Sequence, residues 1–246
     1  MSPTKMQTWA PGIALCLLAT LATPRLRAQD FKTPYPRMAP VEQYLMDRND
    51  EIALARSAAP EAISQNATVL VLSPHGYETA VEGTNGFVCM VERGWVGTLD
   101  WPERWNPKIR GADCLNAAAA RSILPMAEMR TSLFLAGHSL PEVVASLKRA
   151  IASKQVPALG PGAMSYMLGK GSYLTDQGSH NLPHLMFFMP LSDPALWGAG
   201  VKGSPVGSAA YWFTSEKDSE GFPPLRIFTV QVSKWSDGTA VEAQRK

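Results

Sequence analysis

The stretch that decides the fold is Ser-His-Asn-Leu-Pro-His-Leu-Met-Phe-Phe-Met-Pro, residues 179–190. The run Leu185–Met189 is apolar at every position and is followed by a proline, a pattern typical of a strand buried on both faces. We therefore expect a central strand at 185–189. Two of the chain's four histidines, His180 and His184, come just before it. The start of this strand is the first candidate for a functional site.

The first 28 residues have the composition of a signal peptide. Lys5 provides a positive charge, Trp9–Ala22 is a short apolar segment, and Ala28 offers a small residue for cleavage. A retained N-terminal anchor is the alternative, which the Pro-Gly pair at 11–12 and the arginines after the apolar segment disfavour. We expect export to the periplasm or the cell exterior, with residues 29–246 forming one domain.

Removal of this leader changes the charge balance of the chain. It takes away three of the 23 basic residues and no acidic residue, which leaves 20 basic against 21 acidic residues and a net charge of −1. Such a surface gives no electrostatic reason to bind nucleic acid or an anionic membrane. We therefore expect a soluble mature protein without either partner.

Two cysteines remain after cleavage, Cys89 and Cys114. In an oxidising compartment a pair of cysteines predicts one structural disulfide. Closing a loop of this length should add about 3 kcal/mol of stability. Two unpaired buried thiols are the alternative, and a zinc site would need further ligand pairs that the sequence lacks.

Hydrophobic periodicity predicts an α+β domain. The expected sheet is antiparallel or mixed, with helices packed mainly on one face. The strands in 68–92 should form an antiparallel meander, with Asn85-Gly86 at a hairpin tip. Helices are expected at 41–58, 117–130 and 139–154, and strands at 68–72, 77–82, 87–92, 131–136, 163–168, 185–189, 209–213 and 225–232.

Residues 137–141, Gly-His-Ser-Leu-Pro, resemble the nucleophile elbow of α/β-hydrolases, although a proline stands where that family has its last glycine. The resemblance implies a serine hydrolase that uses Ser139 with His180 or His184. The other interpretation is a capping box, in which Ser139 and Glu142 pair at the start of a helix. The capping box explains the same residues without catalysis.

A small-ligand or metal site is the second hypothesis. His180 and His184 could converge in a loop, with Asp176 as a third metal ligand. The alternative is a pair of ordinary loop histidines, one of them bound to a turn carbonyl. We expect Tyr166 and Trp197 to be the aromatic residues at this ligand site.

Other aromatic residues leave two interpretations open. Trp95, Trp101 and Trp105 lie in one long loop, which could be a satellite core or a stacking platform for a ligand. Tyr173 and Tyr211 are further aromatic residues that could line a pocket. Glu92-Arg93, at the end of a predicted strand, is interpreted as a surface pair.

Four stretches, 85–93, 162–167, 183–188 and 235–239, resemble an uncharacterised family of exported bacterial proteins. The resemblance implies export from a bacterial cell and no particular activity, and no motif names a cofactor. We expect an exported domain that binds a small molecule or a metal. A serine hydrolase and a protein-binding module are the alternatives.

Overall fold

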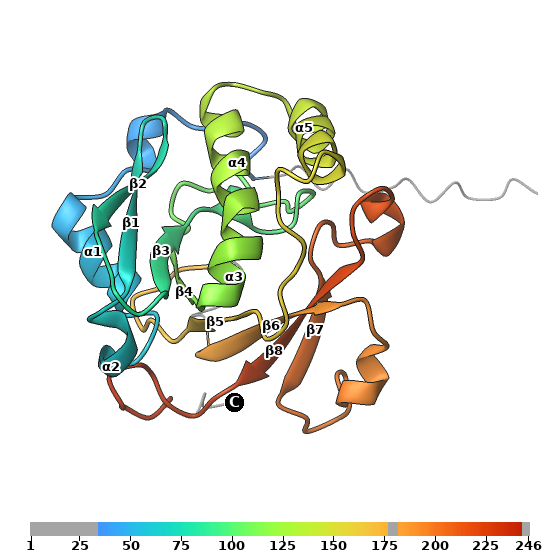
Figure 1. Ribbon diagram of the computed structural model, residues 1–246. Helices are drawn as coiled ribbons and strands as arrows, with labels where there is room; N and C mark the ends of the chain where they lie inside the picture. The colour runs from blue at the N-terminus through green and yellow to red at the C-terminus, as the bar shows by residue number, and fades with distance from the viewer. Residues whose placement is uncertain (1–33, 177–181, 243–246) are drawn as a thin grey trace, which may run out of the picture. The chain divides into compact units, whose positions relative to one another are not determined.

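The fold is built on one mixed sheet of eight strands (Figure 1). The computed structural model describes residues 34–176 and 182–242, all in the larger of the two units of the chain, Thr33–Lys246. The strand order is β2-β1-β3-β4-β5-β6-β8-β7. β1 and β3 are parallel, and the other neighbouring pairs are antiparallel. The strands are β1 (Thr68–Ser73), β2 (Gly76–Val81), β3 (Val88–Glu92), β4 (Gly111–Leu115), β5 (Met164–Met167), β6 (His184–Pro190), β7 (Val206–Ala210) and β8 (Leu225–Gln231).

Helices pack against this sheet on both faces. Successive side chains of a strand point to opposite faces, so β1 places Val69 in a cluster with Ala55 of α1 and Leu70 in the larger core with Phe134 of α4. Figure 1 shows α3 and α4 stacked end to end in front of the sheet. The helices are α1 (Arg48–Arg56), α2 (Glu61–Ser64), α3 (Ala117–Ser122), α4 (Leu124–Leu135) and α5 (Leu140–Ala152), with 3-10 helices η1 (Val41–Gln43), η2 (Gly94–Val96), η3 (Pro194–Trp197) and η4 (Glu216–Ser219).

The predicted α+β fold and the predicted strand at 185–189 are confirmed. β6 lies inside the sheet, between β5 and β8. Its expected burial on both faces is only partly right, because Phe188 is buried while Leu185, Met186 and Phe187 are half-buried. Met186 borders a cavity, while Leu185 and Phe187 point to the opposite face of the sheet and are partly exposed there.

The predicted meander is wrong. β2 runs back along β1, but the chain then crosses the start of β1, and β3 pairs with β1 in parallel on the other side. The crossing is held by local hydrogen bonds rather than by a hairpin turn. Thr84 donates its N–H to the carbonyl of Asn66 at 2.8 Å, and the Asn85 side chain donates to the carbonyl of Ile63 at 2.8 Å. The Asn85-Gly86 pair therefore lies in the connection that crosses from β2 to β3, and not at the tip of a hairpin.

The predicted strand at 131–136 is also wrong, because residues 131–135 belong to α4 and Ala136 is its C-cap. Thr131 donates its hydroxyl to the carbonyl of Ala127, four residues earlier, and accepts from the indole N–H of Trp95 at 3.0 Å. A short apolar run does not distinguish a strand from a buried helix segment. Packing against Trp95 and the core selects the helix here.

The predicted helix at 41–58 is two elements. η1 ends at Gln43, and Asp47 starts α1 as its N-cap, since its carboxylate accepts the N–H groups of Asn49 and Asp50 at 2.9 and 3.2 Å. The polar residues 47–50, which lie in the middle of the predicted helix, therefore form the start of α1. β4 was not predicted, and it carries Cys114 and Asp113 through the sheet.

Candidate functional site

The disulfide between Cys89 and Cys114 is present, as predicted. The two residues are register partners on β3 and β4, and both side chains are fully buried in the cluster beneath α1. Met90 and Asp113, their neighbours in the sequence, form the next register pair. Because strand side chains alternate, that pair faces α4. The disulfide therefore fixes these two strands from the face opposite the site described next.

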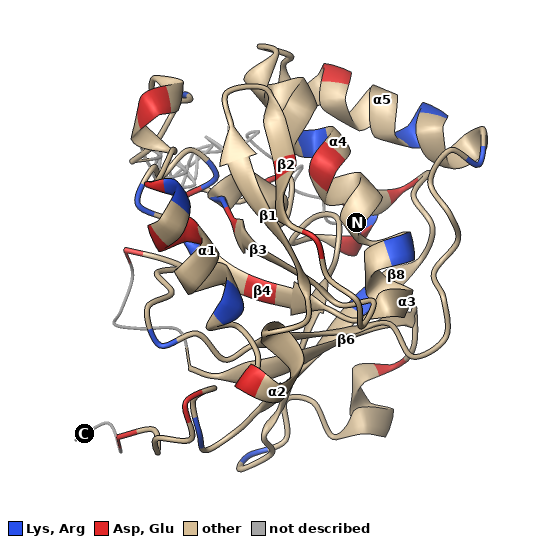
Figure 2. Ribbon diagram, turned by 60° about the vertical axis from the view of Figure 1, so that its left-hand side comes forward, with Lys and Arg blue, Asp and Glu red and all other residues tan. Residues whose placement is uncertain are grey.

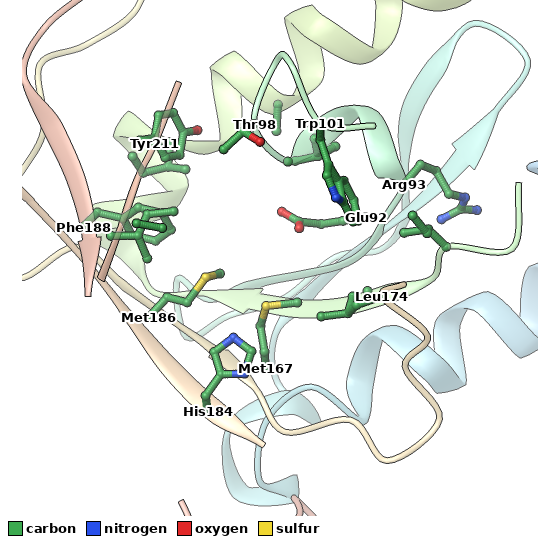
Figure 3. A pocket seen from close by; sticks show the side chains of 18 of the residues that line it. Glu92, Arg93, Thr98, Trp101, Met167, Leu174, His184, Met186, Phe188 and Tyr211 are labelled. Carbon is green, nitrogen blue, oxygen red and sulfur yellow. The ribbon is translucent and has the colours of Figure 1, made fainter. Parts of the chain in front are cut away.

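A cavity of about 570 Å³ lies on the α4 face of the sheet. Its walls are mostly aliphatic, aromatic and methionine side chains, contributed by β5, β6, β8 and α4, by the loop after η2 and by the residues around the end of β7. Figure 3 shows Thr98, Trp101 and Tyr211 on one side and Met167, His184 and Met186 on the other. Glu92 points into the space between them.

Glu92 belongs to a pair of carboxyl groups on β3 and β4. The antiparallel register sets Met90 opposite Asp113 and Glu92 opposite Gly111, so the two acidic side chains are diagonal neighbours on one face. Charged residues lie mainly on helices and loops, but β4 carries an acidic band in the middle of the sheet (Figure 2). A buried acid inside a sheet is rare, because ionisation there is costly.

The pKa values of both carboxyl groups are raised. Burial raises the pKa of Glu92 well above its usual range, and repulsion by Asp113 adds to this effect, while Arg130 opposes it. Burial also raises the pKa of Asp113 to about 7, against smaller opposing effects of Ser165 and Glu92. Two close carboxyl groups in a buried site share protons. Near neutral pH this pair therefore retains a proton.

This pair and its neighbours include buried polar atoms without regular hydrogen bonds. They include both carboxylate oxygens of Asp113, the hydroxyl of Ser165, and Nε and Nη2 of Arg130. Arg130 donates through Nη1 to the carbonyls of Val96 and Gly97, each at 2.8 Å, and its guanidinium lies over the rings of Tyr211 and Trp212. Unpaired buried polar groups are uncommon in proteins and are often found at functional sites.

His184 lies at the rim of the cavity. Its Nδ1 is 2.8 Å from the carbonyl oxygen of Leu182, the kind of contact expected under the alternative of an ordinary loop histidine. The imidazole is half-buried, and burial lowers its pKa despite that hydrogen bond. A histidine with a lowered pKa is mainly neutral at pH 7. His184 therefore adds no positive charge to the site.

The other predicted ligand residues lie elsewhere. Tyr166 packs against Phe87 in the α1 cluster, on the opposite face of β5 from the cavity. Trp197 stacks on Phe228, with ring centroids 4.6 Å apart, on the opposite face of β8. Each prediction identified a strand or loop near the cavity, but the alternation of side chains directs these residues away from it.

Asp176 is held at the surface, in a cluster with Lys108, Tyr35 and Tyr173. These three partners hold the pKa of Asp176 well below its usual range, with Lys108 as the largest cause. His180 lies outside the described residues. Within 34–176 and 182–242, no group of three His, Cys, Asp or Glu side chains is placed to hold a metal ion.

The capping box at Ser139 is present at the start of α5. The backbone N–H and the hydroxyl of Ser139 both donate to the carboxylate of Glu142, at 2.7 and 2.8 Å. These bonds lower the pKa of Glu142. The hydroxyl that the hydrolase hypothesis requires is therefore bound to a helix-capping carboxylate.

The tryptophans of the loop 94–107 lie in two different environments. Trp95 is fully buried and packs with Trp105 in the main core. Trp101, in contrast, lines the cavity, as does Tyr211. Glu92-Arg93 is not a surface pair: Arg93 is buried and binds Glu51 at 2.9 Å on the α1 side. Glu92, Asp113 and Arg130 are the site residues that sequence reasoning missed.

Comparison with family models, curated proteins and solved structures found no match. The geometry of the cavity is therefore the basis of the functional argument. In the described part of the chain, no helix is long and apolar enough to span a membrane.

Proposed function

We propose that the protein binds a small, largely apolar molecule in this cavity, with Glu92 as the main polar contact. The observation that carries the proposal is a carboxylate that points into a space lined mostly by apolar side chains (Figure 3). Small-molecule sites usually have volumes of about 300–1,000 Å³, apolar walls and a few convergent polar groups. Groups with strongly shifted pKa values also cluster at functional sites.

We also propose that the protein is exported, to the periplasm or the cell exterior. A disulfide between Cys89 and Cys114 supports an oxidising compartment. The leader-like composition of residues 1–28, which lie outside the described residues, points the same way. N-terminal sequencing of the mature protein should begin at Gln29, whereas a mature chain that still begins at Met1 would contradict export by cleavage.

The binding proposal can be tested with N-phenyl-1-naphthylamine, an apolar fluorescent probe that is uncharged at neutral pH. Ala209 is exposed and lies on the rim of the cavity, so Ala209→Trp should obstruct the opening without disturbing buried packing. Ala195 is equally exposed but is not part of the cavity lining, and Ala195→Trp is the matched control.

The wild type and Ala195→Trp should show saturable binding at one site, and Ala209→Trp should bind at least about tenfold more weakly. Quenching of Trp101, which lines the cavity, should accompany the signal and be lost in Trp101→Phe. If the wild type does not bind the probe, or all three proteins bind it equally, the cavity is not the binding site.

A further inference from the structure

The charge of the cavity is the feature that identifies its ligand more closely. The carboxylate of Glu92 points into the middle of the cavity, while the side chain of Arg93 points away from it (Figure 3). Arg93 is fully occupied, because it donates to Glu51 and to the backbone carbonyls of Tyr44 and Val91. Among the described residues, neither Glu92 nor Asp113 forms an ion pair.

The ionisable groups around Glu92 come from several elements. β4 contributes Asp113, which has the same sign of charge, and α4 contributes Arg130. The residue after β7 contributes the ring of Tyr211, which is neutral because burial raises its pKa, and β6 contributes the neutral His184. Two acids thus face one guanidinium, so the fully ionised site has a net charge of −1. One bound proton makes the empty site neutral.

A cation bound next to the Glu92 carboxylate can replace that proton. Trp101 stands beside the Glu92 carboxylate, with Tyr211 further along the same wall of the cavity (Figure 3), and aromatic faces attract ammonium groups. An anionic ligand would meet the carboxyl group of Glu92, while Arg130 is not among the residues that line the cavity and donates through Nη1 to Val96 and Gly97. A neutral ligand could bind but would leave the proton in place.

We infer that the ligand is an amphiphilic amine, whose ammonium group pairs with Glu92 while its apolar part packs against Met186, Phe188 and Ile227. This inference rests on the proposed function of the cavity. Binding is an exchange of cations: the ammonium enters the site, and the proton held by Glu92 and Asp113 leaves to solvent. No covalent bond to the ligand forms or breaks.

The test compares octylamine, octan-1-ol and octanoate, which share one apolar chain and differ in the polar end. We expect the wild type to bind octylamine at least about tenfold more tightly than octan-1-ol, since a charge-assisted hydrogen bond is stronger than a neutral one. Octanoate should bind most weakly. Calorimetry at pH 6.5 in two buffers of different ionisation enthalpy should show proton release with the amine and none with the alcohol.

Glu92→Gln should remove the preference for the amine, so that octylamine and octan-1-ol bind with similar affinity. Glu128→Gln is the matched control, because Glu128 is a half-buried acid on α4 whose pKa is also raised by burial but which does not line the cavity. The comparison of the three ligands on the wild type remains decisive even if Glu92→Gln folds poorly.

Two negative results have different meanings. If octan-1-ol binds as tightly as octylamine, the amine inference is wrong and the proposed binding function stands. If no member of the series binds and the fluorescent probe does not bind either, the proposed function itself is wrong.

Discussion

Replacement of Asp113 by asparagine should make the protein more stable above neutral pH. Asp113 is fully buried, and its carboxylate oxygens have no regular hydrogen bond among the described residues. Burial raises its pKa from the ordinary 3.8 to about 7. Asparagine has nearly the same shape as the protonated acid and cannot ionise, so Asp113→Asn removes the cost of charging a buried group.

The direction and the magnitude of this stability change follow from the linkage between proton binding and folding. An acid whose pKa is higher in the folded state binds more protons folded than unfolded, so the stability it contributes falls as the pH rises from about 4 to about 7. A pKa difference of about 3, at 1.36 kcal/mol per pKa unit, corresponds to at most about 4 kcal/mol. The variant should therefore match the wild type near pH 4 and exceed its free energy of unfolding by up to about 4 kcal/mol at pH 8.

Urea denaturation at intervals between pH 4 and pH 8 measures this difference directly. Asp218→Asn, which changes an exposed acid, controls for the loss of one negative charge. A stability difference between Asp113→Asn and the wild type that stays constant with pH would refute the reasoning. It would show that Asp113 is ionised throughout and is held by partners.

Three further predictions concern the fold around the site. Ser139→Ala should cost about 1 kcal/mol in chemical denaturation and Ser139→Asp should be tolerated, because both changes act on a helix cap; labelling of Ser139 by a fluorophosphonate probe would contradict this role. Reduction of the Cys89–Cys114 disulfide should lower the melting temperature, with a cost of about 3 kcal/mol, and titration of unreduced protein should find no thiol. His184→Gln should lower the melting temperature because the bond to the Leu182 carbonyl is lost; a variant that melts like the wild type but loses zinc binding would show instead that His184 is a metal ligand.

Much of the sheet could be predicted from the sequence, because most strands carry a local pattern. The apolar runs of β1 and β6 and the alternation in 77–82 and 87–92 identify strands without knowledge of their neighbours. β4 was missed because Asp113 and Cys114 interrupt any apolar pattern in a five-residue segment. The parallel pairing of β1 and β3 was missed because it depends on hydrogen bonds across the chain, such as that from Thr84 to Asn66.

The candidate site was predicted only in part, because it too depends on strands that are far apart in the sequence. His184, expected at the start of β6, and Tyr211, a candidate pocket residue, both line the cavity. Glu92 was interpreted as a surface residue because a charged pair at a strand end is usually exposed. Its burial depends on strand order, which places β6 and β7 on the far side of β4. No local pattern contains that order, so the partnership of Glu92 and Asp113 could not be predicted.

The most direct test of the central claim is a crystal structure of the protein soaked with octylamine or octan-1-ol, whichever binds more tightly. The account predicts one ligand in the cavity, with its polar end within about 3 Å of the Glu92 carboxylate and its chain against Met186 and Phe188. A ligand bound elsewhere while the cavity holds only solvent, or a cavity closed by rearranged side chains, would contradict it.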